Sequence, residues 1–355
     1  MPGHAYSRRS FLARLATVGA LPILAGCATS DPANAPVSRP PRTAMLLPLS
    51  GPRADLGQTM ARAVWLVEDR SGLPQRVEIF DTGPSPQGAA TAAAQAVAAG
   101  AEVIVGPLFS DHTTAVLESA PKARIMTLSN NDRLAASGAW VFGVTPAQSA
   151  KAAAGFAAKQ GARSISILQP SGDFGGQSAE ALARAAKANR MTAIPAVGMQ
   201  DTDNLLAALR ARGAGQLPDS LYLPTSDATS RRAARIAADA GISVIGSLQW
   251  ADAPSEALKG IETLTFAGPD PQLFTSLSAT YRSALGEEMG IISGLAVDAV
   301  MFASALPRDR NGRVQMTARE PLDGLLGQCA FRKDRTCARD LAMLQMKGGQ
   351  LRKVA

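Results

Sequence analysis

From residue 43 onward, short apolar runs alternate with longer Ala-rich amphipathic stretches, a pattern typical of repeated strand–helix units. The runs are almost continuously apolar, which indicates strands buried on both faces. The expected strands are residues 44–49, 77–81, 103–106, 125–128, 164–168, 192–197, 220–223 and 243–248. The expected helices are residues 57–70, 86–99, 111–120, 147–160, 176–189, 202–213, 227–240, 272–284 and 293–305. The pattern predicts an α/β fold of two lobes, each a mostly parallel sheet with helices on both faces.

Two proline-containing breaks, at Thr145-Pro146 and near residues 266–271, predict hinges between the lobes. We therefore assign residues 43–145 and about 267–310 to lobe 1, and residues 146–266 and about 311–355 to lobe 2. Beyond Pro307 the pattern changes again. It predicts a turn at residues 309–312, a short helix at 320–326, and a hairpin of strands at 328–332 and 338–345.

Residues 1–26 have the organisation of a signal peptide, with a basic region followed by an apolar run. Arg8 and Arg9 lie in a segment that resembles the twin-arginine export motif, although a general secretory signal that contains two arginines fits as well. The run ends in Leu-Ala-Gly-Cys, which resembles the bacterial lipobox and makes Cys27 the lipidated first residue of the mature chain. Ala28 follows it, where an Asp would favour retention in the inner membrane, so we expect anchoring at the outer membrane.

Residues 27–42 form the expected lipidated tether, because the segment is rich in proline and has little to bury. Removal of residues 1–26, which carry three arginines and no acid, lowers the formal net charge from +7 to +4. A charge this small does not indicate nucleic-acid binding. With two histidines in the whole chain, a histidine-based metal site is not expected either.

The remaining cysteines, Cys329 and Cys337, flank the turn of the predicted hairpin. In an oxidising compartment a cross-strand disulfide is the favoured interpretation, and two separate buried thiols are the alternative. A pair at this spacing without a nearby histidine does not indicate a metal site.

Candidate ligand-binding residues follow the carboxyl ends of the predicted strands, where α/β sheets collect ligands. Small and hydroxylic residues are common there, which lets a ligand approach the backbone. The candidates are Ser50, Gly51, Gly106, Ser110, Ser129, Asn130, Asn131, Thr225 and Ser226, and Asp81 and Thr82 occupy an equivalent position. The structural alternative is that Ser110 and Ser226 are helix N-caps and that Asn130-Asn131 is an ordinary turn.

Motifs of common enzyme classes are absent from the sequence: it contains no P-loop, no dinucleotide-binding glycine pattern after the first strand and no nucleophile elbow. A Ser-His-Asp arrangement in the mature chain would have to use His112, which lies near a predicted helix start. We therefore expect a protein that is not an enzyme and that needs no cofactor and no metal.

The first lobe resembles the type I periplasmic binding proteins, the leucine/isoleucine/valine-binding class. The resemblance rests on LLPLSGP at residues 46–52 with LGQ at 56–58, IVGPL at 104–108 and TLSNN at 127–131. Together with the sequence of the predicted hairpin, these motifs are similar to the penicillin-binding protein activators, outer-membrane lipoproteins that carry this fold on their carboxyl-terminal domain. The resemblance covers about residues 43–355 and is strongest in the first lobe.

Departures from the amino-acid-binding members favour the activators. Ser110 and Ser129 match the residues that would hold the ligand's charged groups, but Pro224-Thr225-Ser226 stands where an aromatic residue is common, and Tyr222 lies out of register. The helical-repeat domain that precedes the fold in enteric activators has no counterpart in residues 28–42.

The resemblance therefore implies a lipid-anchored activator on the periplasmic side of the outer membrane. Its expected partner is a bifunctional penicillin-binding protein, a peptidoglycan synthase. The alternative is the substrate-binding lipoprotein of a branched-chain-amino-acid-type ABC transporter, with a small amphipathic ligand in the cleft between the lobes.

Overall fold

The computed structural model describes residues 42–71, 77–254, 258–261, 264–317, 320–347 and 350–355. Arg8, Arg9, Cys27 and most of the predicted tether lie outside these residues. The contacts between residues divide the chain into two compact units. Among the described residues, unit 1 comprises those within 42–142, 292–324 and 328–337, and unit 2 those within 143–291, 325–327 and 338–355.

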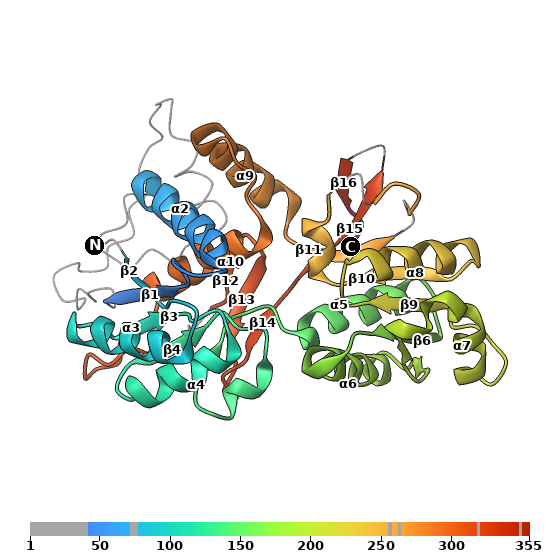
Figure 1. Ribbon diagram of the computed structural model, residues 1–355, viewed down its shortest axis with the longest axis horizontal. Helices are drawn as coiled ribbons and strands as arrows, with labels where there is room; N and C mark the ends of the chain where they lie inside the picture. The colour runs from blue at the N-terminus through green and yellow to red at the C-terminus, as the bar shows by residue number, and fades with distance from the viewer. Residues whose placement is uncertain (1–41, 72–76, 255–257, 262–263, 318–319, 348–349) are drawn as a thin grey trace, which may run out of the picture. The chain divides into compact units, whose positions relative to one another are not determined.

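Unit 1 is built on a five-stranded parallel sheet in the order β2-β1-β3-β4-β5. The strands are β1 (Thr43–Leu47), β2 (Glu78–Asp81), β3 (Val103–Val105), β4 (Arg124–Thr127) and β5 (Trp140–Val141). The helices are α2 (Ala54–Ser71), α3 (Pro86–Ala98), α4 (Ser110–Ser119) and most of α10 (Ile291–Ser304), with the short 3-10 helix η1 (Asp132–Ala135). Helices α3 and α4 cover one face of the sheet, and α2 covers the other (Figure 1).

The core of unit 1 forms because α3 presents a stripe of alanines to the sheet. Ala89, Ala92, Ala93 and Ala96 are buried and pack with Leu46, Ile104 and Val116. Small side chains at these spacings let the helix approach the strands closely, so the strand residues themselves can be large. The apolar runs at β1 and β3 are therefore buried on both faces, as their composition predicted.

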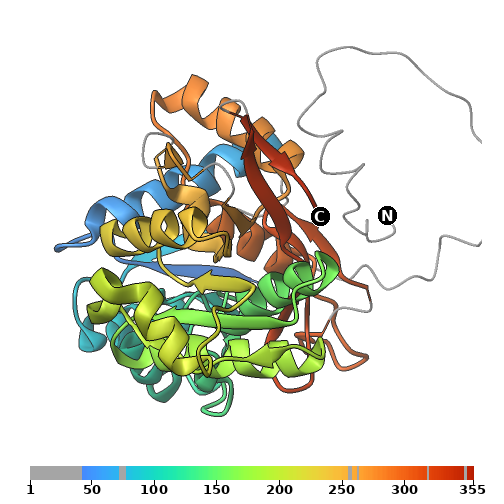
Figure 2. The same ribbon diagram turned by 90° about the vertical axis from the view of Figure 1, so that its right-hand side faces the viewer.

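Unit 2 contains an eight-stranded sheet in the order β16-β15-β11-β10-β9-β6-β7, with β8 also paired to β6. Its strands are β6 (Ser164–Gln169), β7 (Thr192–Ala193), β8 (Val197–Gly198), β9 (Ser220–Leu223), β10 (Ser243–Gly246), β11 (Thr265–Gly268), β15 (Ala342–Lys347) and β16 (Gln350–Lys353). β15 and β16 are antiparallel and form the hairpin at the C-terminus (Figure 2). β15 also pairs antiparallel with β11, and the remaining strand pairs are parallel.

Helices cover both faces of this second sheet. α5 (Pro146–Lys159) and α6 (Gly172–Ala188) pack on one face around Ile165, Tyr222 and Ile245. α7 (Leu205–Arg212) and α8 (Ala228–Asp239) pack on the other face around Leu221 and Trp250. The unit also contains α9 (Pro271–Leu285) and the 3-10 helices η2 (Met199–Asn204) and η3 (Leu248–Asp252). The two-lobed α/β architecture predicted from the sequence is thus confirmed.

A three-stranded sheet of β12 (Leu322–Gly324), β13 (Gly327–Phe331) and β14 (Cys337–Arg339) completes the fold. Phe331 packs against Trp140, Phe142 and Phe302 with ring-centroid distances of 5.1, 5.9 and 5.1 Å. Thr336 forms a parallel bridge with Val141, so the hairpin lies beside β5 at the edge of the first sheet. The contacts of Phe331 with these three rings therefore pack the β13–β14 hairpin against the rest of unit 1.

The sequence pattern was wrong at three places toward the C-terminus. Residues 320–326, expected as a short helix, contain β12, and Pro321 disfavours helical backbone at the residue before it. The expected hinge at 266–271 contains β11, whose four residues are fully buried. α9 also belongs to unit 2, although residues 267–310 were assigned to lobe 1. Within the described residues, no helix has the length and apolar character needed to cross a bilayer.

Candidate functional site

The loop after β1 is organised by a carboxylate on the neighbouring strand β2. Asp81 Oδ1 accepts hydrogen bonds from the backbone N–H groups of Leu49, Ser50 and Gly83 at 2.8, 3.2 and 2.8 Å. Partial burial raises the pKa of Asp81, but the hydrogen bonds from the Ser50 hydroxyl and from the three N–H groups outweigh it and hold the pKa below its ordinary value. Ser50, a candidate from the sequence, is thus held in place by an ionised Asp81, and Gly51, the next candidate, follows it in the same loop.

A chain of hydroxyl groups joins the carboxyl end of β4 to the start of α4. Thr127 Oγ1 contacts Thr113 Oγ1 at 2.8 Å and donates to the carbonyl of Pro107 at 3.0 Å. Ser110 Oγ and Ser129 Oγ are 2.8 Å apart, and Ser129 Oγ also accepts from the N–H of Asn131 at 3.2 Å. The structure therefore brings together Ser110, Ser129 and Asn131, as the sequence predicted.

Thr113 and Thr127 belong to the same network but were not among the candidates. Both are fully buried, and they lie fourteen residues apart in the chain. A threonine inside a helix or a strand has no distinctive sequence pattern. The signal that could have identified Thr113 and Thr127 is that each lies within three residues of a candidate, Ser110 or Ser129.

Gly106, another candidate, makes the close packing of β3 against β1 possible. Its φ is 100°, a conformation that other residues rarely adopt, and a Cβ atom there would meet the carbonyl oxygen of Leu46. The peptide bond to Pro107 is cis. Gly106 therefore has a structural requirement of its own, independent of any ligand.

The start of α4 contradicts the structural alternative for Ser110, which was that this residue is the N-cap of the helix. Phe109, rather than Ser110, is at the N-cap position, and no side chain caps this end. His112 is buried, with its ring edge-on to Phe109 at 5.2 Å between centroids. Within the described residues its Nδ1 atom has no hydrogen-bond partner, and nothing in these contacts couples it to a nucleophile.

The candidates of unit 2 build the turn between β9 and α8. Thr225 Oγ1 contacts Ser230 Oγ at 2.8 Å, and Ser226 Oγ donates to the carbonyl of Gln249 at 3.1 Å. The N-cap of α8 is Asp227, which accepts from the N–H of Ser230, so the N-cap alternative for Ser226 is wrong. These hydroxyls lie at the carboxyl end of β9, as expected, and stabilise the local backbone.

Tyr222, inside β9 and before this turn, is fully buried in the core beneath α5. Burial raises the pKa of its hydroxyl despite a hydrogen bond with Ser149, so the side chain stays protonated at neutral pH. The phenol is a core side chain of unit 2.

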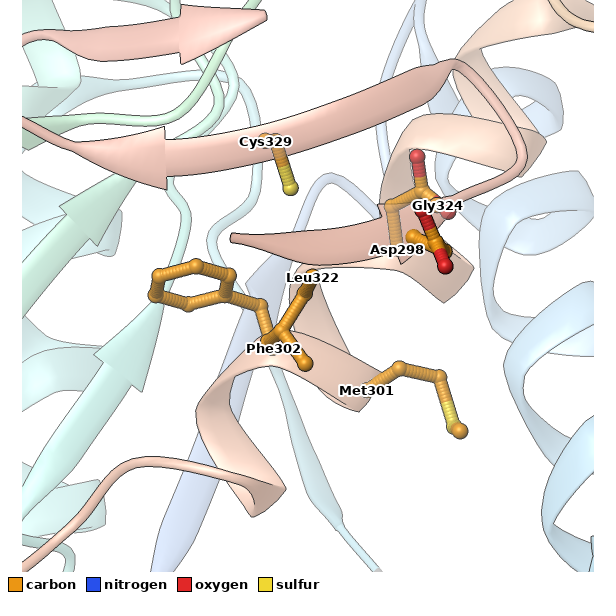
Figure 3. A pocket seen from close by; sticks show the side chains of 7 residues that line it. Asp298, Met301, Phe302, Leu322, Gly324 and Cys329 are labelled. Carbon is orange, nitrogen blue, oxygen red and sulfur yellow. The ribbon is translucent and has the colours of Figure 1, made fainter. Parts of the chain in front are cut away.

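A small cavity lies within unit 1 between α10 and the strands β12 and β13. Met301, Phe302, Leu322 and Cys329 contribute most of its apolar lining, and Asp298 lies at one end (Figure 3). Its volume is about 20 Å³, which is room for one water molecule and too little for an amino acid.

Cys329 on β13 and Cys337 on β14 are both buried, with exposed fractions of 2% and 1%. The structure gives both as thiols, the alternative considered for them, and the disulfide in an oxidising compartment stays a prediction. The neighbouring strands that carry them are held together by sheet pairing. Among the described residues, no group of three or more His, Cys, Asp or Glu side chains is placed to hold a metal ion.

Comparison with known proteins relates the chain to binding proteins and to activators. A model of the family described as periplasmic binding protein matches residues 40–350. The penicillin-binding protein activator LpoA of Glaesserella parasuis is 33% identical over 145 residues, which are 40% of this chain and 24% of that protein. The chain thus spans about a quarter of the curated relative.

Solved structures show the same fold at low identity. A putative branched-chain amino acid ABC transporter protein of Rhodospirillum rubrum has a TM-score of 0.72 at 17% identity, with coverage of 88% of this chain and 99% of that one. The LpoA C-domain of Haemophilus influenzae, described as a regulator of PBP1A, has a TM-score of 0.69 at 17% identity, with coverage of 88% and 99%. Full-length LpoA of the same organism has a TM-score of 0.70 at 18% identity, with coverage of 90% of this chain and 59% of that one. Because the family model matches most of its length, the chain belongs to the periplasmic binding protein family.

Proposed function

We propose that this chain is a non-enzymatic, lipid-anchored activator that binds a bifunctional penicillin-binding protein in the periplasm and stimulates peptidoglycan synthesis. The observation that carries the proposal is the 33% identity to a penicillin-binding protein activator over 145 residues. The fold shared with the LpoA C-domain is compatible with it. Partner and activity belong to the proposal, since the matched region is a quarter of the curated relative.

The candidate hydroxyls support an activator over an amino-acid binder. Ser110 and Ser129 contact each other, Thr225 contacts Ser230, and Ser226 donates to a backbone carbonyl. A ligand that took over these groups would first have to displace interactions that already satisfy them, which reduces the net gain from binding. The hydroxyls are instead part of the local scaffold of each unit.

An activator of this kind acts by differential binding. A protein that binds the active conformation of a synthase more tightly than the inactive one shifts the population toward the active state. A coupling of 1–3 kcal/mol, typical of such effects, changes the equilibrium ratio of active to inactive synthase by about 5- to 150-fold. The lipid tether would add to this by keeping the activator at high local concentration near a membrane-bound enzyme.

The test adds the purified mature chain to a purified bifunctional penicillin-binding protein and measures the rate of glycan polymerisation. We expect a rate increase on the order of tenfold that saturates with the concentration of the chain. An unchanged rate with every bifunctional synthase of the same cell would contradict the proposal. Capture of an ABC permease from cross-linked envelopes, without any synthase, would contradict it as well.

The second candidate function is that of a substrate-binding lipoprotein, which the likeness to the Rhodospirillum rubrum protein favours. A branched-chain amino acid at 100 times its dissociation constant would then stabilise the chain by about 2.7 kcal/mol in a thermal-shift measurement. Under this function Ser110→Ala would abolish the stabilisation, whereas Ser119→Ala, at the other end of α4, would leave it unchanged. Under the activator proposal neither variant alters the response, because no free amino acid shifts the melting temperature.

A further inference from the structure

The amino ends of the strands of unit 1 form an edge of the sheet opposite the candidate site. Arg42, Glu102 and Arg124 lie side by side on the chain entering β1, β3 and β4, because Glu102 N–H donates to the Arg42 carbonyl and Arg124 N–H donates to the Glu102 carbonyl, both at 2.8 Å. Lys122 precedes Arg124 in the turn after α4. Arg42, Lys122 and Arg124 are exposed.

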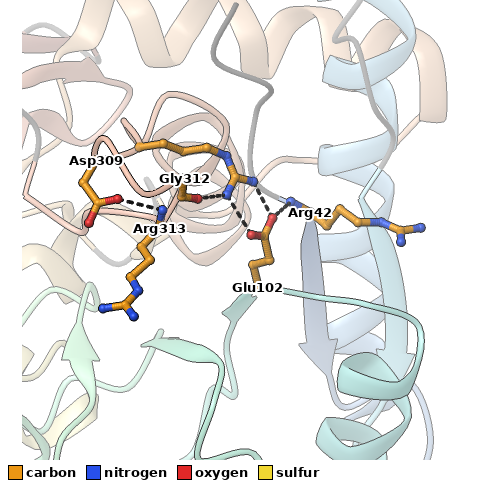
Figure 4. Close-up of polar contacts among 6 residues, drawn as sticks. Arg42, Glu102, Asp309, Gly312 and Arg313 are labelled. Atoms are coloured by element: carbon orange, nitrogen blue, oxygen red, sulfur yellow. Dashed lines mark hydrogen bonds and ion pairs between the residues drawn. The ribbon is translucent and has the colours of Figure 1, made fainter. Parts of the chain in front are cut away.

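A loop from residue 308 to residue 313 is fastened to this edge through Glu102. The Glu102 carboxylate accepts two hydrogen bonds from Arg308 and a third from the N–H of Arg42 at 3.1 Å. Arg308 also donates to the carbonyl of Gly312 at 2.6 Å. The charge of Glu102 is thus paired with Arg308. The side chain of Arg42 points away from Glu102 (Figure 4).

The same loop presents two further cations. Asp309 Oδ1 accepts from the N–H groups of Asn311 and Arg313, both at 2.9 Å, which closes the loop into a tight turn. Arg310 and Arg313 are exposed on it. The turn therefore has a defined conformation that keeps these two side chains in solvent.

The tip of the β13–β14 hairpin continues the row beyond β5. The N–H of Val141 donates to the carbonyl of Arg335 at 2.9 Å, and the Arg335 guanidinium lies 5.8 Å from the centroid of the Trp140 ring. Arg332, Lys333 and Arg335 are exposed at this tip.

We call these eight exposed cations the basic edge: Arg42, Lys122, Arg124, Arg310, Arg313, Arg332, Lys333 and Arg335. Exposed acids at the same end of unit 1, Asp69, Glu78, Glu118 and Asp334, are fewer. Asp334 is also engaged with the N–H and the hydroxyl of Thr336.

The chain reaches the basic edge directly from its predicted lipid anchor. Arg42 is the first described residue and is itself part of the edge, and fourteen residues separate it from Cys27 in the sequence. We propose that the basic edge docks on the anionic phospholipid surface in which the lipid at Cys27 is embedded. Clustered cations bind such headgroups when they come within about a Debye length, roughly 8–10 Å, and a lipid anchor combined with a basic patch holds a protein more stably than one acyl chain.

The test uses the chain from residue 28, which contains every described residue and lacks both the signal peptide and Cys27. Flotation with vesicles of phosphatidylcholine, with or without phosphatidylglycerol, measures binding. We expect binding to the anionic vesicles alone, with loss at high salt. Lys122→Glu combined with Arg124→Glu should lower the partition coefficient at least about tenfold.

The matched control is Lys151→Glu combined with Lys187→Glu, which makes the same charge change at exposed positions of α5 and α6 in unit 2. The control should bind as the parent does, and circular dichroism should show that both double variants are folded. Absence of parent binding to anionic vesicles would overturn the proposal, as would equal losses in the two double variants. If the variant with Lys122→Glu and Arg124→Glu floats as the parent does but no longer captures a synthase, the basic edge binds an acidic protein partner and the proposal is overturned. Because the vesicles contain no protein, the result is independent of the proposed function.

Discussion

At the residue scale, Asp81 is the side chain on which the geometry of the β1–α2 loop depends. Its Oδ1 atom accepts three backbone N–H groups, and its pKa lies below the ordinary value of 3.8. The folded chain therefore binds the proton of Asp81 less tightly than the unfolded chain does. The stabilisation is present above pH 3.8 and is lost as the pH falls through the lowered pKa.

We predict that Asp81→Asn lowers the free energy of unfolding by about 1 kcal/mol at neutral pH, because a charged acceptor becomes a neutral one. The matched control is Glu78→Gln, which removes the same charge from an exposed position on the same strand. Urea unfolding at neutral pH and below pH 3.8 measures both variants. The difference between Asp81→Asn and the parent should shrink at the lower pH, and a difference that is constant with pH would show that the charge of Asp81 is not responsible.

Gly106 offers a second test at this scale. We expect Gly106→Ala to cost about 2 kcal/mol or more, because φ is 100° and the added Cβ would meet the carbonyl of Leu46. Gly155→Ala in α5 is the control, since nothing lies within 4 Å of a Cβ there, and it should stabilise the helix by up to about 1 kcal/mol. Thermal unfolding of both proteins checks the prediction. Equal effects would mean that the β3–α4 connection relaxes around the new methyl group.

Sequence analysis could predict which candidate residues lie close together only where these residues directly follow neighbouring strands. Ser110 and Ser129 follow two adjacent parallel strands, so their proximity follows from the strand order. The contact of Thr113 with Thr127 depends on how α4 rotates against β4, which is decided by packing. The predicted ligand contacts of Ser50, Thr225 and Ser226 remain predictions.

At the element scale, the helices were predicted closely because their alanine stripes repeat with the helical period. The errors fall on short strands without such a signal. β11 ends at Gly268 and is followed by Pro269, a pair with the composition of a turn, and its strand character depends on pairing with β10 and β15. β16 lies at the sheet edge and carries exposed charged residues, so its sequence lacks the apolar run of the buried strands.

The β13–β14 hairpin depends on a single aromatic anchor. Phe331→Ala should cost about 3–5 kcal/mol and expose the hairpin tip to protease, since Phe331 is buried against three aromatic rings. Arg332→Ala, at the next and exposed position, should change stability by no more than about 0.5 kcal/mol. Limited proteolysis with mapping of the first cleavage measures the effect. A Phe331→Ala protein that resists cleavage at the tip would show that the sheet pairing alone holds the hairpin.

At the scale of the whole molecule, the attachment to the membrane is the property that can be tested most directly. We predict that Cys27→Ser leaves the chain either in the periplasmic fraction after a wash with high salt or as unprocessed precursor, because no acyl chains can be attached. The salt wash removes electrostatic binding through the basic edge. Thr29→Ala is the control and should stay with the membrane in processed form. Membrane retention of processed Cys27→Ser protein after the wash would contradict lipidation at this residue.

The assignment of segments to the two units has a consequence for how the chain acquires its structure. Unit 1 includes residues 328–337 and unit 2 includes residues 338–355, so neither is complete in a chain that is still emerging N-terminus first. Domains usually fold one after another during synthesis. Here the strands of the first sheet are all made by residue 141, but the hairpin that lies beside β5 comes only with residues 327–339, and both units are completed within the same final stretch of chain. Until then the hairpin does not cover the edge strand β5, so we expect the nascent chain to be most prone to edge-to-edge pairing before this stretch is made.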